Sequence, residues 1–209
     1  MQRWLNTGTD EERVEKIVSL GVGRESAELA SGEDVEWRAV RSKSHHPAAI
    51  LFLACGGLYG ASLYLLKSTT QGWHVTDAVG FDCHYDESVS VGVQALHRPH
   101  VDDVLVHHEC EGHGTGFVQQ NFNVFVIDSS KLELALSAEE VLKENDWPKT
   151  YVVSQRSSFA LTAATFDGSG SIEETRRTEK NGKLTVEKRT FQWSPKKFCF
   201  APSPFVKVK

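Results

Sequence analysis

The sequence predicts a mainly β fold, an antiparallel meander of roughly ten or more strands that follows a short helical N-terminus. Apolar residues recur at helical spacing near the start of the chain, and from Val35 onward they alternate with polar residues, as in half-buried strands. Strands and helices do not alternate along the chain, which argues against a doubly wound nucleotide-binding fold. We therefore expect a helical appendage at residues 1–32 and an antiparallel β domain, sandwich-like or a partial propeller, at residues 33–209.

The composition is that of a folded globular protein. Of its 209 residues, 40% are hydrophobic and 24% are charged, which is typical of a domain with a core. The net charge of −5, with scattered basic residues, argues against nucleic acid as a partner. The longest apolar stretch, residues 47–66, is interrupted by glycines and predicts two buried strands instead of a membrane span.

The strongest helix signal covers residues 7–20. Thr9 and Glu12 have the spacing of a capping box, and Val14, Ile17 and Val18 form one apolar stripe. Glycines at positions 21 and 23 end this helix, and residues 24–30 predict a second short one. Because glycines separate this part from the strands, we expect that removal of residues 1–32 leaves a folded β domain.

Strand signals follow in order, each bounded by turn residues. They cover residues 35–42, 48–55, 61–67, 73–79, 88–96, 104–106, 121–127, 131–136, 151–164, 172–178, 183–193 and 198–208. Asn181 and Gly182 predict a tight two-residue hairpin. Pro202 and Pro204 interrupt the last strand and predict that it lies at a sheet edge.

Three further features complete the expected fold. Residues 137–145 predict a short helix, because Ser137 and Glu140 repeat the capping-box spacing. Residues 166–171 predict a mobile loop. Three tryptophans fall in strand patterns and are expected in the core: Trp37, Trp73 and Trp193.

The middle of the chain resembles the blades of FG-GAP-type β-propellers. Leu96 followed by Asp103-Val104-Leu105-Val106 is similar to the aspartate-led strand of those blades, and a glycine-rich turn comes next, as in the family. The resemblance covers residues 58–136 and implies blade-like sheets. The family's calcium loop is replaced here by residues 100–103, so the resemblance does not extend to calcium binding. The whole chain also resembles a type of β-rich bacterial protein, which implies no function.

Histidines and cysteines gather around the central strand and the connection that precedes it. His108 and Cys110 share a strand face, His113 follows a glycine, and Cys83 or His84 comes from the earlier connection. Imidazole and thiolate are zinc ligands, so His108, Cys110, His113 and Cys83 are one candidate metal site. A Cys83–Cys110 disulfide is a second interpretation, and surface histidines beside buried thiols are a third.

Localisation bears on these alternatives. No targeting segment is visible at the start of the chain, so the protein is either cytoplasmic or extracytoplasmic with its leader removed, and we favour the second. In an exported protein the four cysteines allow three disulfide pairings.

These patterns predict a non-enzymatic binding or structural module without a cofactor, whose partner is an unidentified small molecule or protein. No nucleophile elbow occurs, and the glycine loop at residues 112–116 is followed by a strand instead of a phosphate-binding helix. We expect the functional surface at the sheet end that carries His84, His108, Glu109, His113 and Gly114. The alternative is a metal-dependent hydrolase that uses the histidine and cysteine cluster.

Overall fold

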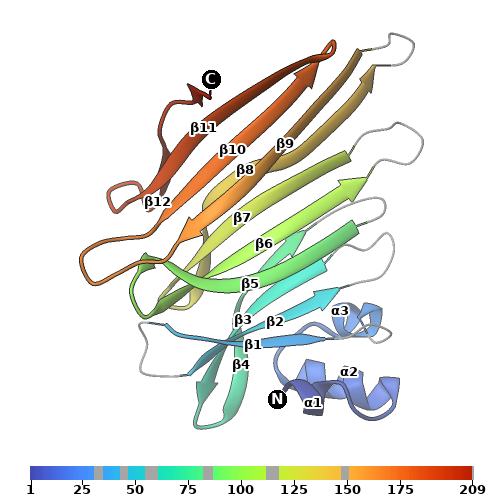
Figure 1. The fold of residues 1–209 in the computed structure, drawn as a ribbon. Coiled ribbons are helices and arrows are strands. Elements are labelled where there is room, and N and C mark those ends of the chain that lie inside the picture. Colours follow the sequence, from blue (N-terminus) through green and yellow to red (C-terminus); the bar gives the residue numbers. More distant parts are fainter. Residues whose placement is uncertain are drawn as a thin grey trace. The chain divides into compact units, whose positions relative to one another are not determined.

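The computed structural model describes residues 1–30, 35–42, 47–54, 61–81, 87–111, 118–146 and 151–208. These residues form three short helices followed by thirteen antiparallel strands in two sheets, which confirms the predicted fold class (Figure 1). The chain divides into two compact units, Met1–His84 with Ile127–Glu133 and Tyr85–Val126 with Leu134–Lys209. The boundary predicted between residues 32 and 33 thus falls inside the first unit.

Three helices open the chain: α1 (Gln2–Leu5), α2 (Asp10–Ser19) and α3 (Arg24–Leu29). The predicted capping box is present, because the Glu12 backbone N–H donates to the Thr9 hydroxyl at 3.3 Å and the Thr9 N–H donates to the Glu12 carboxylate at 2.8 Å. Gly21 follows α2 with a φ of 94°, a conformation that glycine adopts without strain. Arg24 donates to Glu15 at 2.6 Å, and this hydrogen bond raises the pKa of the guanidinium.

The first sheet has the strand order β1-β2-β3-β4. Its strands are β1 (Glu36–Val40), β2 (Ala48–Ala54), β3 (Ala61–Thr69) and β4 (Gly72–Phe81). The helices and this sheet share one core, in which Leu5 and Ile17 pack with Leu51, Leu53 and Leu66, all of them completely buried. The helical N-terminus is therefore a structural layer of the first unit. None of the described helices is long and apolar enough to span a bilayer.

The second sheet runs in sequence order from β5 to β12, and β13 also pairs with β11. Its strands are β5 (Glu87–Arg98), β6 (Val101–Glu111), β7 (Val118–Asp128), β8 (Lys131–Asp146), β9 (Tyr151–Thr162), β10 (Ser171–Lys180), β11 (Lys183–Ser194), β12 (Cys199–Pro202) and β13 (Val206–Lys207). Asn181 and Gly182 join β10 to β11 with φ values of 53° and 71°, which confirms the predicted two-residue hairpin. β12 lies at the edge of the sheet, as Pro202 predicted.

The predicted helix at residues 137–145 is wrong, because this segment is part of β8. Leu136 and Ala138 are buried in the core of the second unit, and Val141 to Asp146 pair with β9. Burial and pairing in a sheet override the local helix preference of alanine, glutamate and leucine, which is worth less than about 1 kcal/mol per residue.

The loop between β9 and β10, expected to be mobile, is docked onto β5. The Ala164 N–H donates to the Ala95 carbonyl at 2.8 Å, and the Gly170 N–H donates to the Leu96 carbonyl at 2.7 Å. Within the loop, Thr165 and Gly168 exchange backbone hydrogen bonds of 2.9 and 3.2 Å. This contact joins an edge strand to the middle of the same sheet, so the sheet curls at this end.

Candidate ligand-binding site at one end of the second sheet

Three connections of the second sheet lie at the same end. Consecutive strands are antiparallel, so the β5–β6, β9–β10 and β11–β12 connections all fall on one side. We call the region formed by residues 97–101, 163–170 and 194–198 the loop end. The hydrogen bonds from Ala164 and Gly170 to β5 hold two of these connections together, and a ring contact between His97 and Trp193 brings in the third.

A buried histidine–aspartate pair organises the β5–β6 connection. His97 is 3% exposed and Asp103 is fully buried, and His97 Nδ1 lies 2.5 Å from one oxygen of the Asp103 carboxylate. The other oxygen accepts the backbone N–H groups of Leu96 and His97, both at 2.8 Å. The strand register is irregular between Gln94 and Arg98. Asp103 therefore binds backbone groups at an irregularity of the ladder, where they would otherwise stay unpaired.

The same hydrogen bond defines the proton on the imidazole. Because a carboxylate only accepts, His97 Nδ1 donates, and in the neutral ring Nε2 is then an acceptor. His97 Nε2 is buried and has no hydrogen-bond partner in the described part of the chain. The pair thus has a structural role, to hold the connection and the aromatic ring beside it.

Trp193 is the aromatic centre of the loop end. Its ring lies 5.2 Å from that of His97 and packs edge-on against Phe198 and Phe200, at centroid distances of 5.2 and 5.4 Å. It also packs against the core of the second unit, where the sequence predicted it. Contacts from β5 and β12 and from the β11–β12 turn therefore fix its orientation.

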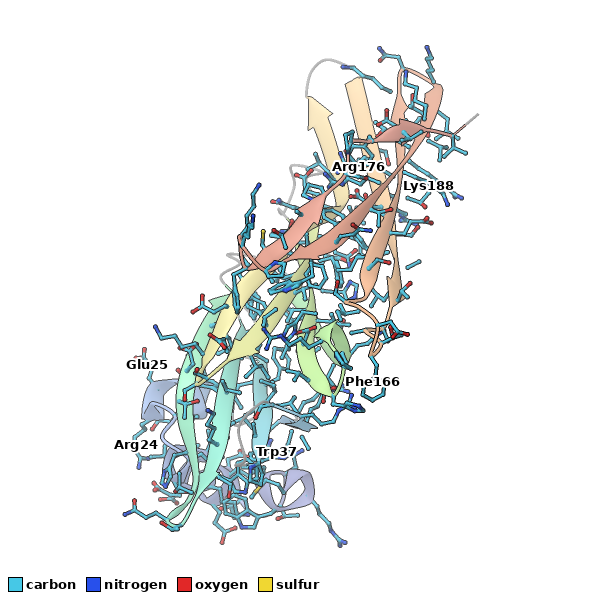
Figure 2. The ribbon with its side chains drawn as sticks, turned by 90° about the vertical axis from the view of Figure 1, so that its left-hand side faces the viewer. Arg24, Glu25, Trp37, Phe166, Arg176 and Lys188 are labelled. Carbon is cyan, nitrogen blue, oxygen red and sulfur yellow. The ribbon has the colours of Figure 1, made fainter. Side chains whose placement is uncertain are left out.

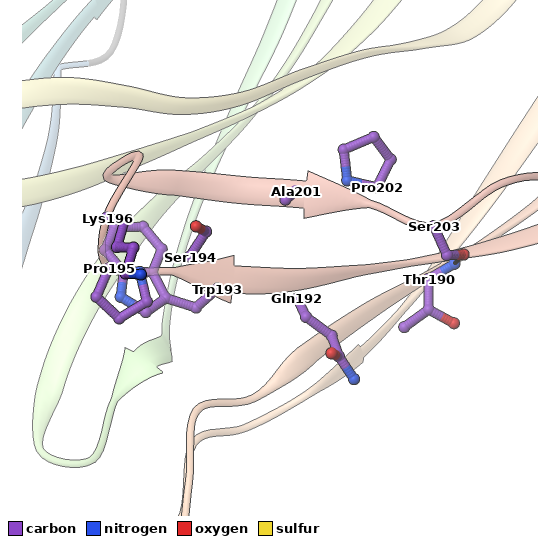
Figure 3. A pocket seen from close by; sticks show the side chains of 9 residues that line it. All are labelled: Thr190, Gln192, Trp193, Ser194, Pro195, Lys196, Ala201, Pro202 and Ser203. Atoms are coloured by element: carbon purple, nitrogen blue, oxygen red, sulfur yellow. Dashed lines mark hydrogen bonds between the residues drawn. The ribbon is translucent and has the colours of Figure 1, made fainter.

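An open pocket of about 710 Å³ lies at the β11–β12 hairpin. It is lined by Thr190, Gln192, Trp193, Ser194, Pro195, Lys196, Ala201, Pro202 and Ser203. In Figure 3, Trp193, Pro195 and Lys196 gather at the turn, and Thr190 and Ser203 mark the other end. The Thr190 N–H donates to the Ser203 hydroxyl at 3.0 Å, and the Ser203 N–H donates to the Thr190 carbonyl at 2.7 Å, so that wall is fixed. The volume is within the usual range of small-molecule sites.

Two exposed rings lie at the same end of the sheet. Phe166, on the β9–β10 loop, is 85% exposed (Figure 2). Its ring lies 5.1 Å from that of His100 on the β5–β6 turn. Both rings lie at the loop end, on the β9–β10 and β5–β6 connections.

Of the predicted site, the structure describes His108 and Glu109. Both are half-buried on β6, and as neighbours in a strand they point to opposite faces. His108 is opposite Val89 and Asn121, toward the sheet end away from the loop end. The other predicted ligand-binding residues lie outside the described residues: His84, His113 and Gly114.

The predicted metal and disulfide sites also fall largely outside the described part of the chain. The backbone of Cys110 is opposite Gln119 at the end of β6, whereas its side chain and all of Cys83 are not described. Cys199 is a free, half-buried thiol. Within the described ranges, no three side chains of histidine, cysteine, aspartate or glutamate meet as metal ligands would. The zinc site and the Cys83–Cys110 bridge stay predictions.

The sequence did not single out the pocket as a site. One signal was present: Thr190, Gln192 and Ser194 alternate with the buried Phe191 and half-buried Trp193, and a proline turn follows directly. A polar strand face that ends in such a turn is compatible with a ligand-binding site at a sheet edge. The pairing of His97 with Asp103 had no such signal, because it depends on the irregular register of β5 and β6.

Fold and site together describe an antiparallel β protein with an open pocket at the loop end of its second sheet. No protein-family model, curated protein or solved structure matches the chain. A function is therefore inferred from the geometry of the site.

Proposed function

We propose that the protein is a non-enzymatic binding module that holds a polar ligand in the pocket at the β11–β12 hairpin. The pocket itself carries the proposal, since hydroxyl, amide and ammonium groups line it together with Trp193 and two prolines. Binding sites typically combine a few polar groups with apolar and aromatic walls. None of the nine lining residues is an acid, a histidine or a cysteine.

The arrangement of these groups favours recognition over catalysis. Nucleophilic catalysis by serine requires a base within hydrogen-bonding distance. Lys196 is the only ionisable side chain among the lining residues, and no hydrogen bond joins it to Ser194 or Ser203 in the described structure. We propose further that the module needs no cofactor and acts outside the cytoplasm. No described feature favours the metal-dependent hydrolase, which metal analysis of protein purified without a histidine tag would test.

Ligand-observed NMR with a panel of oligosaccharides and small polar molecules tests the proposal. We expect binders whose signals change with the parent protein, and at least a tenfold loss of affinity in a Gln192→Ala, Lys196→Ala variant. Lys180→Ala, an exposed change near the β10–β11 hairpin, is the matched control and should bind as the parent does. If every binder found keeps its affinity in the pocket variant, while that variant melts like the parent, the pocket is not the site.

A further inference from the structure

The basic residues on the two faces of the C-terminal strands differ in whether they have acidic partners. Strand register places Glu174, Arg176 and Arg189 on the face that continues from the buried Ile172. The register places Arg156, Arg177 and Lys188 on the other face, together with Thr190 and Gln192 of the pocket. Figure 2 labels one residue of each face, Arg176 and Lys188. We call the face with Glu174, Arg176 and Arg189 the inner face. The face with Arg156, Arg177 and Lys188, on β9–β11, is the open face.

Arginines on the inner face are neutralised. Arg176 Nε donates to the Glu174 carboxylate at 3.0 Å, and Arg189 Nε donates to it at 2.5 Å. On the open face, Arg156 and Arg177 are exposed, and neither has an ion-pair or hydrogen-bond partner among the described residues. Within the part of the chain that the structure describes, the inward arginines are thus paired and these two guanidinium groups are not.

Arg156 and Arg177 are also direct cross-strand neighbours. Residues in this relation have Cβ atoms about 4.5–5.5 Å apart, and like charges placed there destabilise a sheet. Two guanidinium groups so placed form a site for carboxylate or sulfate oxygens, because each presents several donors in a fixed plane. The charge of this part of the chain is also basic. Residues 171–209 contain ten basic and four acidic residues on all faces together, a balance of +6 in a chain whose net charge is −5. Register places Glu173 and Glu179 on the open face with Arg177, and Glu173 is engaged by Lys188.

Hydroxyl and amide groups connect the arginine pair to the pocket. The rows between them contain Ser158, Thr175, Thr190 and Gln192 on the same face by register, together with Glu173, which forms an ion pair with Lys188. From Arg177 to Ser171, the β10 residue opposite Gln192, the strand rises about 20 Å, at about 3.3 Å per residue. Such groups both donate and accept, as the hydroxyls of a sugar do. The open-face positions of β9–β11 include no aromatic residue on which a nucleic-acid base would stack.

We infer that the open face of β9–β11 binds a linear acidic polysaccharide, with Arg156 and Arg177 on its carboxylate or sulfate groups and the pocket on a neighbouring sugar. This inference rests on the proposed function and names the class of its ligand. Lys188 adds a third cation that Glu173 only partly neutralises, since their 2.9 Å ion pair is exposed to solvent.

Isothermal titration with polygalacturonate at physiological ionic strength tests the inference, with dextran as the neutral polysaccharide. We expect binding of polygalacturonate alone, and at least a tenfold loss of affinity in an Arg156→Gln, Arg177→Gln variant. Lys180→Gln is the matched control, because Lys180 is exposed on the same strand but on the inner face by register. An equal loss in both variants would overturn the inference, since it would show attraction to net charge alone.

Other polymers separate the remaining outcomes. If polyglutamate or single-stranded DNA binds as tightly as polygalacturonate through the same arginines, a sugar chain is not the ligand class and the inference is wrong. If polygalacturonate does not bind but neutral ligands depend on Gln192 and Lys196, the inference fails and the proposed function stands. If the arginine variant loses polygalacturonate and the pocket variant does not, the open face binds the polymer and the pocket assignment fails.

Discussion

At the scale of single residues, Glu174 is a buried acid of the second unit with partners on three sides. Its carboxylate is fully buried and accepts hydrogen bonds from the Ser157 hydroxyl at 2.7 Å and from Arg176 and Arg189. The Phe205 ring lies 4.4 Å from both guanidinium carbons, so an aromatic face covers the two cations. A buried acid is tolerated here because every part of the cluster has a partner.

Replacement of Glu174 by glutamine should lower the free energy of unfolding by about 3–5 kcal/mol, since two mostly buried cations would lose their counter-charge. Urea unfolding followed by circular dichroism measures this change. Glu173→Gln is the matched control, because Glu173 is the next residue in the chain and its ion pair with Lys188 is exposed. We expect less than about 1 kcal/mol from the control. Similar losses in the two variants would show that the buried cluster contributes no more than a surface pair.

At the scale of elements, the docked β9–β10 loop joins the second sheet to its own edge strand, β5. Gly170 is buried, its N–H is bonded to β5, and a Cβ added to it would lie 1.9 Å from the Thr162 carbonyl oxygen. Two residues earlier, a Cβ added to Gly168 would meet nothing within 4 Å. Packing therefore requires glycine at position 170, and nothing in the packing requires it at position 168.

Gly170→Ala should therefore destabilise the second unit by about 1–3 kcal/mol, the usual cost of overpacking. The measurement is the urea midpoint together with exchange of the backbone amide at position 170, which undocking of the loop should speed in the variant. Gly168→Ala is expected to change stability by less than about 0.5 kcal/mol. Equal stability of both variants, with unchanged exchange, would mean that the loop does not depend on this close approach.

At the scale of the whole molecule, each of the two units has its own buried cluster. The helices complete the first cluster, in which Ile17 and Ala27 are fully buried beside Leu51 and Leu53. The second cluster gathers residues of β5–β12, among them Phe122 and Ile172. The helical segment that the sequence set apart as an appendage is thus half of a core.

Deletion of residues 1–30 should expose the apolar face of the first sheet and abolish the cooperative unfolding of the first unit. Differential scanning calorimetry and binding of a hydrophobic dye report the two effects. In the full chain, Ile17→Asp should also weaken the cooperative unfolding of the first unit, because it buries an unpaired charge. Glu11→Asp, on the exposed side of α2, should leave that unfolding unchanged. The sequence alone predicted the opposite result, and a truncated chain that melts like the parent would support that prediction.

Features that depend on residues close together in the sequence were predicted better than features that depend on distant ones. The capping box at Thr9 and the hairpin at Asn181 depend on residues three or fewer positions apart, and both are confirmed. The segment at residues 137–145 had the same local signal as α2, but its partners lie on β9. Whether it forms a helix or a strand therefore depends on long-range pairing, which local propensity does not report. The predicted site at His108 and Glu109 remains a prediction, because most of its members lie outside the described residues.

By itself, the sequence determined that this protein is an antiparallel β chain with short helices at its start, because alternation and turn residues act over a few positions. Only the tertiary structure decided which helices enter a core, that Asp103 binds His97, and that Arg156 stands directly opposite Arg177. The last two arrangements depend on strand register, because a shift of one residue turns every side chain of a strand to the other face. The open face of β9–β11 exists only once that register is set.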